Sequence, residues 1–209
     1  FFVQSFSGAR FQDVKLPDIH PKALDRRIAL EEKRDAIPSQ VLLGFQAPPM
    51  GDEDCYPLML LENHLAGNAG RLGEKIREAQ VPAYRVLVKY EPRARGGSIA
   101  ASFVSLPADE EAVLNAVEGE ISRLLEAPIL YKDYRSAMNL SLGKYWIGQQ
   151  ARFSQIAFIV ENILSGNGLE AVLEHATRLQ GVKEEDLQEV ARRVFKLDRS
   201  VALRVHGRS

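Results

Sequence analysis

Apolar and polar residues alternate in four stretches of the chain, which is the pattern of β-strands that bury one face. The first stretch places Val41, Leu43 and Phe45 on one side and stops at Pro48-Pro49. The other three stretches are 84–91, 98–106 and 201–205. Because Gly96-Gly97 lies between the second and third stretches, we expect those two strands to form an antiparallel hairpin.

Apolar residues recur every three or four positions in most of the remaining chain, which predicts amphipathic helices. Cys55, Leu58, Leu61 and Leu65 form the apolar face of the first helix, which is expected to end near Gly67. The further predicted helices cover 71–81, 108–126, 131–150, 153–164, 169–179 and 184–195. The apolar stripe is widest in 153–164, so we expect this helix to be the most buried. The stripe consists of Phe153, Ile156, Ala157, Val160, Ile163 and Leu164.

This order of strands and helices predicts an α+β fold, a two-layer α/β domain whose mostly antiparallel sheet carries helices on one face. The first 37 residues differ in composition, with several prolines and the charge run Glu31-Glu32-Lys33-Arg34-Asp35. We therefore expect residues 1–37 to be a linker or the end of a preceding domain, and residues 38–209 to form the domain itself. The chain begins at Phe1 with no signal-peptide pattern, which we interpret as a fragment or a processed piece.

The charge balance excludes some classes of function. The 209-residue chain has 27 Lys and Arg against 28 Asp and Glu, a formal net charge of −1. Nucleic-acid-binding domains usually carry a basic excess, so we expect no nucleic-acid partner. No apolar run approaches the ~18 residues that cross a bilayer, so no membrane span is expected. Cys55 is the single cysteine, and its place on an apolar helix face predicts a buried thiol without a disulfide.

The four histidines, His20, His64, His175 and His206, are far apart in the sequence. No HExxH or HxxEH run exists, so we expect no metal ligands in this chain. The nearest approach to such a motif is Glu174-His175, where Ala171 stands in place of the first histidine. We expect His175 to be an exposed helix histidine.

The chain has no Gly-x-Ser-x-Gly nucleophile motif. Two other features have both a structural and a functional interpretation. The loop 67–70 could hold an anion on backbone N–H groups, but it lacks the Lys-Ser/Thr of a phosphate-binding loop, so a plain helix-to-helix turn is favoured. A basic cluster lies on the predicted hairpin, where Glu91 interrupts it, and we expect a solvated face. The cluster consists of Arg85, Lys89, Arg93 and Arg95.

One pair of residues carries a candidate binding chemistry, Arg77 near the end of the second helix and Tyr84 at the start of the next strand. A guanidinium offers two parallel donors to a carbonyl or carboxylate, and a phenol offers one neutral donor. The pair could therefore hold a peptide backbone or a developing oxyanion. From spacing alone, a solvated helix arginine and a sheet tyrosine are the favoured interpretation.

Three groups of segments between Gln40 and His206 together carry a family resemblance. They are Leu43-Gly44-Phe45-Gln46-Ala47-Pro48-Pro49 with Asp52-Glu53-Asp54 and a helix ending Leu65-Ala66-Gly67; Gly70-Arg71-Leu72-Gly73-Glu74-Lys75-Ile76-Arg77-Glu78 with Ala83-Tyr84; and Glu184-Glu185-Asp186-Leu187 with Val190-Ala191-Arg192-Arg193-Val194-Phe195. In this order and spacing the chain resembles the C-terminal, non-catalytic domain of the M16 zinc metallopeptidases. That family includes pitrilysin, insulin-degrading enzyme and the mitochondrial processing peptidase.

The resemblance implies the two-layer α/β fold of that family and a division of roles between two related domains. In M16 peptidases one domain holds zinc through HxxEH and a distal Glu, and the second supplies an Arg/Tyr pair that faces the zinc across a chamber. Arg77 and Tyr84 match that pair, which implies contacts with the substrate or the oxyanion, in trans to the zinc. The chain departs from the family at Val81-Pro82, where Gly-Leu is usual, and at Ala69-Gly70, where small hydroxyl residues are common.

The resemblance also implies partners and a location. The expected partners are a homologous HxxEH-bearing M16 domain or subunit, which would hold the zinc, and a peptide substrate. This chain would hold no cofactor and would be inactive alone. The family resemblance points to the periplasm. The alternative function is a catalytically inactive M16-like domain used in assembly, as in the core subunits of a respiratory complex.

Overall fold

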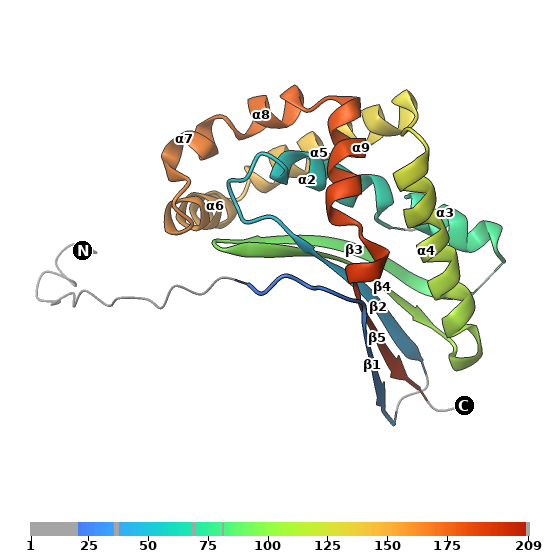
Figure 1. Cartoon of the computed structure of the whole chain (residues 1–209). Helices are drawn as coiled ribbons and strands as arrows, with labels where there is room; N and C mark the ends of the chain where they lie inside the picture. The colour runs from blue at the N-terminus through green and yellow to red at the C-terminus, as the bar shows by residue number, and fades with distance from the viewer. Residues whose placement is uncertain (1–20, 36–37, 68–69, 81, 208–209) are drawn as a thin grey trace, which may run out of the picture.

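The computed structural model describes residues 21–35, 38–67, 70–80 and 82–207, which form helices layered on one five-stranded sheet (Figure 1). The strands lie in the order β1-β5-β2-β4-β3. Their bounds are β1 (Ile28–Lys33), β2 (Ser39–Ala47), β3 (Ala83–Arg93), β4 (Gly96–Ser105) and β5 (Val201–His206). The helices are α2 (Cys55–Leu65), α3 (Arg71–Glu78), α4 (Glu110–Glu126), α5 (Tyr131–Gly148), α6 (Arg152–Leu164), α7 (Gly168–Leu173), α8 (His175–Gly181) and α9 (Glu184–Val194), with 3₁₀ turns η1 (Pro107–Asp109) and η2 (Leu197–Arg199).

Backbone pairing confirms the predicted α+β fold with a mostly antiparallel sheet. β2 pairs antiparallel with both β4 and β5, and β3 pairs antiparallel with β4, while β1 runs parallel to β5. β3 and β4 form the predicted hairpin, with Arg93 opposite Gly96 across a two-residue turn. The next residue, Gly97, must be glycine because a Cβ there would stand 2.6 Å from the carbonyl oxygen of Pro48.

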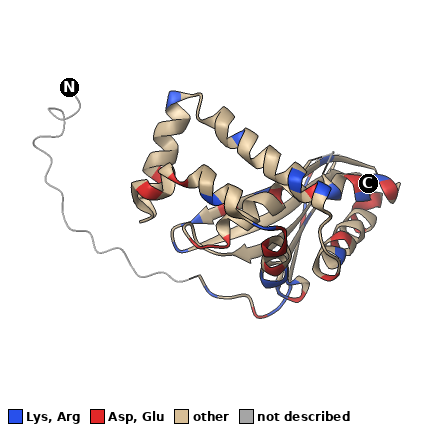
Figure 2. Cartoon of the chain, turned by 90° about the horizontal axis from the view of Figure 1, so that it is seen from above, with Lys and Arg blue, Asp and Glu red and all other residues tan. Residues whose placement is uncertain are grey.

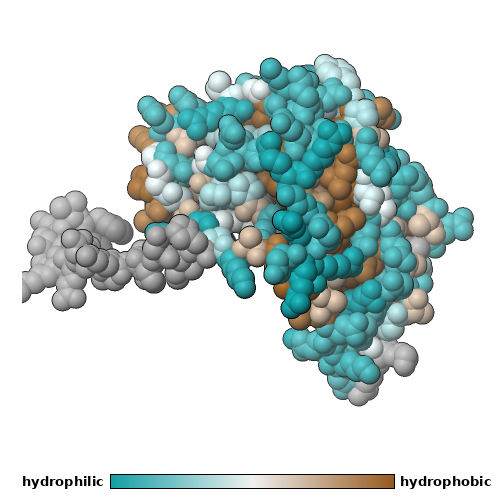
Figure 3. All heavy atoms as spheres, in the orientation of Figure 1, coloured by the Kyte–Doolittle hydropathy of each residue, from teal (hydrophilic) through white to brown (hydrophobic). Residues whose placement is uncertain are grey.

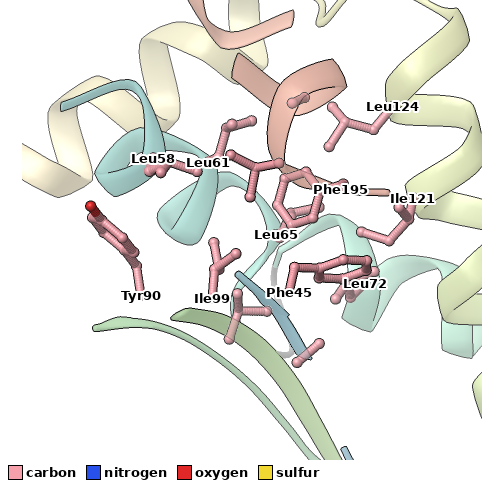
Figure 4. Close-up of a cluster of buried hydrophobic side chains, with 14 of the residues drawn as sticks. Phe45, Leu58, Leu61, Leu65, Leu72, Tyr90, Ile99, Ile121, Leu124 and Phe195 are labelled. Atoms are coloured by element: carbon pink, nitrogen blue, oxygen red, sulfur yellow. The ribbon is translucent and has the colours of Figure 1, made fainter. Parts of the chain in front are cut away.

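One face of the sheet builds the core, as the alternation predicts. In β2, Val41, Leu43 and Phe45 are at most 4% exposed, and the residues between them lie on the opposite face. Figure 1 shows the helices on one side of the sheet, and Figure 4 shows core side chains meeting between the sheet and α2, α4 and α9. The Phe45 and Phe195 rings pack edge to face with centroids 5.2 Å apart. These contacts fix the helical layer over the strands.

The predicted apolar face of α2 is confirmed. Cys55, Leu58, Leu61 and Leu65 of α2 are all buried. The first turn of α9 carries three acidic residues, which its positive N-terminal end favours, and the Asp186 carboxylate accepts a 2.7 Å hydrogen bond from the Lys183 backbone N–H.

The structure corrects the prediction for residues 28–33, which form the strand β1. Residues 28–33 were expected to belong to a linker or a preceding domain, but they pair along their whole length with β5. The charge run of β1 obscured this pairing, because all six of its residues are exposed and an edge strand needs no apolar face. The remaining division of the chain into 1–37 and 38–209 stays a prediction, and residues 1–20 lie outside the described range.

The prediction that 153–164 forms the most buried helix is wrong. α6 has the expected bounds, but of its residues only Asn162 is buried. Phe153 is 82% exposed and Leu164 is 79% exposed. The apolar stripe therefore predicted the helix correctly, but it did not show whether other parts of the chain cover that stripe. The predicted helix 169–179 is also divided, into α7 and α8, with Glu174 between them.

Candidate functional site

The helix α3 presents Arg77 to solvent because its apolar residues lie on the opposite side. Leu72 and Ile76 are buried against the core, and Arg77, in the last turn, is exposed. Two backbone hydrogen bonds complete the end of the helix: the Ala79 N–H donates to the Lys75 carbonyl at 2.9 Å, and the Gln80 N–H donates to the Arg77 carbonyl at 3.0 Å. Arg77 is therefore held at a defined helix end and directed away from the core.

The turn after α3 has an unusual backbone at Gln80, with φ of 55°. This left-handed conformation favours glycine, and the M16 pattern has its usual glycine one position later, at 81. Pro82 then leads directly into β3. The end of α3 therefore carries strain at Gln80, where a glycine would have none.

Tyr84 lies at an irregularity of the edge strand β3. The register shifts between Ala83 and Arg85, so that Tyr84 falls at a bulge, and its side chain is 64% exposed. The regular alternation begins after it, with Val86 and Val88 buried. Bulges of this kind redirect a side chain out of the strand pattern. Tyr84 therefore does not pack into the core as an ordinary sheet tyrosine would.

A buried carboxylate of α4 pairs with Arg71, the first residue of α3. Glu120 of α4 is 1% exposed, and its Oε1 lies 3.3 Å from Nε of Arg71 and 2.5 Å from Nη2 of Arg123. The hydrogen bond to Glu120 raises the pKa of Arg123. Arg123 belongs to α4 itself, so the buried carboxylate links α4 to α3 through Arg71.

The described residues contain no group of three or more His, Cys, Asp or Glu that could hold a metal ion. Zinc sites need three or four such ligands, so these residues do not fit a zinc site. His206 pairs instead with Glu110 through Nδ1 at 2.7 Å. His64 is buried, burial lowers its pKa to about 4, and its Nε2 has no hydrogen-bond partner. His20 lies outside the described residues.

His175 is buried, not exposed as predicted. It is 8% exposed, and its ring is surrounded by Tyr56, Tyr145 and Phe158 with centroid distances of 5.3, 4.7 and 5.0 Å. Burial lowers its pKa, so the imidazole is neutral. These aromatic partners come from three different helices, and no spacing along the sequence could have shown that they meet.

The buried thiol of Cys55 agrees with its prediction. Cys55 is 4% exposed, its Sγ donates to the Pro49 carbonyl at 3.1 Å, and it accepts a hydrogen bond from the Tyr90 hydroxyl. Burial raises the pKa of the Cys55 thiol, which keeps it protonated and unreactive. The basic cluster on the hairpin is exposed, also as predicted.

A cavity of about 260 Å³ lies beside the aromatic residues around His175 and is the second candidate for a site. Cys55, Tyr56, His175 and Arg178 are among the residues that line it. Arg178 is already paired with Glu174 at 2.7 Å, and the cysteine is protonated. The described residues that line this cavity therefore provide no activated nucleophile. Arg77 and Tyr84 remain the better candidates because both are exposed and both match the M16 motif.

No helix in the described part of the chain is long and apolar enough to cross a membrane.

Among curated proteins, no sequence matches the chain. Solved structures do match. A protease from Helicobacter pylori is 16% identical with a TM-score of 0.86, covering 97% of this chain and 50% of that chain. The chain therefore spans about half the length of that protein.

Two further solved structures share the fold. A chain of complex III₂ from Candida albicans is 12% identical with a TM-score of 0.81, covering 96% of this chain and 50% of that chain. The periplasmic protease PqqL from Escherichia coli is 17% identical with a TM-score of 0.72, covering 99% of this chain and 24% of that chain. Identities this low show the fold alone. The family model described as the peptidase M16 inactive domain matches residues 5–139. The chain therefore belongs to the M16 peptidase inactive-domain family, as its sequence motifs predict.

Proposed function

We propose that this chain is the substrate-clamping, non-zinc-binding part of an M16 zinc metalloendopeptidase. It would complete the active site of a partner domain or subunit that carries HxxEH. The observation that carries the proposal is the exposure of Arg77 and Tyr84, in the two positions where the M16 pattern has its Arg/Tyr pair, at either side of one turn. Both side chains point away from the core and can reach a second molecule.

The two residues would act on the substrate by hydrogen bonding. The Arg77 guanidinium would donate to a peptide carbonyl or to the oxyanion formed from it, and the Tyr84 hydroxyl would donate from a second direction. The anchoring of α3 through Glu120 supports this role, since a clamp works only if its donors are held in place before the substrate arrives. Zinc in the partner would supply the Lewis acid and the activated water.

The second candidate function is a catalytically inactive M16-like assembly domain. The fold of the complex III₂ chain from Candida albicans favours it, because that neighbour is by name part of a complex. The exposed Arg77 and Tyr84 favour the clamp, since an assembly domain has no need of two hydrogen-bond donors at this turn. For the location we propose the periplasm, which rests on the neighbouring periplasmic protease PqqL.

The proposal is tested by association with a zinc-bearing M16 domain from the same genome. We expect a one-to-one complex at about micromolar concentration by analytical ultracentrifugation, because a specific interface of roughly 1,000 Å² or more is needed to form a chamber. Metal analysis should place zinc only in the HxxEH partner. A lack of association with every such domain of the genome would contradict the clamp and leave the assembly function.

A further inference from the structure

The helix α6 exposes many large apolar side chains. Its one buried residue is polar: the Asn162 side-chain amide donates to the Phe158 backbone carbonyl at 2.9 Å, and the Asn162 backbone carbonyl accepts from the Asn167 backbone N–H at 3.0 Å. Five large apolar residues of α6 are exposed, beside a few polar ones. Phe153, Ile156, Val160, Ile163 and Leu164 are between 45% and 82% exposed. A surface helix of a monomer usually turns its large apolar residues toward the core.

Large apolar side chains are also exposed on α5 and α7, the two helices that adjoin α6 in the sequence, and we group them with the exposed face of α6 as the α6 patch. Trp146 and Ile147 at the end of α5 are 56% and 68% exposed, and Leu169 and Leu173 of α7 are 53% and 74% exposed. Figure 3 shows hydrophobic atoms among hydrophilic ones at the end of the molecule where α6 and α7 lie. Nine large apolar side chains thus form the patch.

The patch is too large for an ordinary monomer surface. With roughly 150–200 Å² as the full area of a large apolar side chain, these exposed fractions amount to on the order of 1,000 Å². The largest apolar patch on a typical monomer is about 300–600 Å². A stable dimer of standard size needs about 800 Å² from each partner. The patch therefore has the area of one complete half of a dimer interface.

The pattern within α6 is self-complementary. Phe153, Ile156, Val160 and Ile163 form an apolar seam along the helix. Phe153 and Val160 are seven residues apart, as are Ile156 and Ile163, so the seam repeats with the heptad period of a coiled coil. The seam is also symmetric about its centre. When two copies of α6 lie antiparallel, Phe153 of one faces Ile163 of the other, and Ile156 faces Val160.

The charges of α6 favour the same arrangement. Arg152 stands at its start and Glu161 in its last third, and Figure 2 shows the rest of the ribbon mostly without charged residues. An antiparallel pair brings the Arg152 end of one helix to the Glu161 end of the other and also aligns the helix dipoles favourably. A parallel pair would place like charges together. A membrane surface fits less well, because Glu161 and Glu170 outnumber the single Arg152 here and lipid-binding helices are basic.

We propose that the α6 patch is the interface of a symmetric homodimer, in which a second copy of this chain packs its α6 antiparallel against the first. Figure 1 shows α3, which carries Arg77, at the opposite end of the molecule from α6. The dimer therefore leaves Arg77 and Tyr84 accessible to another partner. This proposal stands apart from the clamp function, and its test needs only this chain.

The test is sedimentation equilibrium of the chain and of two variants at about 50 μM, a concentration above the Kd expected for an interface of this size. The parent chain should have twice the 23.3 kDa mass of one protomer. Val160→Glu, at the centre of the seam, should raise the dissociation constant at least about 100-fold and give a monomer, because two buried carboxylates would face apolar side chains. Val160 is 45% exposed in one chain, so the variant should retain the circular dichroism and melting behaviour of a folded protomer.

Leu130→Glu is the matched control, since Leu130 is 58% exposed and precedes α5 at the end away from Trp146. It should leave the dimer intact.

A second pair of variants tests the antiparallel orientation of the two α6 helices. Ile156→Glu should dissociate the dimer, and adding Val160→Lys should restore association through Glu–Lys pairs across the antiparallel seam. A monomeric parent chain at this concentration would overturn the proposal. So would a dimer that Val160→Glu leaves unchanged.

Discussion

Replacing Arg77 with alanine in the proposed complex with a zinc-bearing M16 partner should lower kcat/KM by roughly 10²–10³, because one lost oxyanion donor typically costs about 2.7–4 kcal/mol of transition-state stabilisation. The melting temperature of this chain should barely change, since Arg77 is exposed and its replacement leaves no cavity. Steady-state kinetics and thermal unfolding of the same variant separate the two effects. Arg93→Ala, which removes a 75% exposed arginine side chain from the hairpin, is the control and should leave activity unchanged.

Tyr84→Phe extends this prediction to the second donor. The change removes only the hydroxyl group, so a role in binding the oxyanion predicts a loss of the same order, again without loss of stability. Tyr131→Phe is a closely matched control, because Tyr131 is 65% exposed and Tyr84 is 64% exposed. The absence of the usual Gly-Leu before Tyr84 makes the arginine the stronger of the two tests. If Arg77→Ala keeps kcat/KM within a factor of about two of the parent, the clamp is abandoned.

Phe195→Ala should lower the free energy of unfolding by about 3–5 kcal/mol, the usual cost of removing a buried phenylalanine. Phe195 is 2% exposed, follows α9 and packs edge to face against Phe45 of β2, so it joins the helical layer to the sheet. Its loss would leave a cavity that both layers line. Urea unfolding followed by circular dichroism measures this change.

The control for Phe195→Ala is Tyr131→Ala, which removes an aromatic ring that is 65% exposed. We expect a change within about 0.5 kcal/mol, as for most surface substitutions. A loss below about 1 kcal/mol for Phe195→Ala would show that the helical layer does not depend on this contact. The account of the core between β2 and α9 would then be wrong.

The sheet and its layer of helices could be predicted because their signals are local. Alternation in β2 places Val41, Leu43 and Phe45 on the core side, and the three- and four-residue spacing in α2 does the same for its leucines. β1 could not be predicted, because an edge strand with no buried residue carries no alternation. α6 was assigned correctly as a helix but wrongly as buried, since periodicity shows which face is apolar and not what packs against it.

The candidate site was only partly readable from the sequence. Arg77 and Tyr84 were found through the M16 motif, and the structure adds that both are exposed and that Tyr84 falls at a bulge. The anchoring of α3 by Glu120 was not predicted, because α3 and α4 are separated by the β3–β4 hairpin. The aromatic surroundings of His175 likewise depend on helices that meet only in the folded chain.

The central claim, that this chain completes the active site of a zinc-bearing partner, is tested most directly by titrating an HxxEH-bearing M16 domain with it and following peptide hydrolysis. The rate should rise with added chain and saturate at one equivalent, while the chain alone hydrolyses nothing. Addition of the Arg77→Ala chain should form the same complex by ultracentrifugation with at most about one hundredth of the activity. A zinc-bearing domain that binds this chain and cleaves peptide no faster than it does alone would contradict the claim.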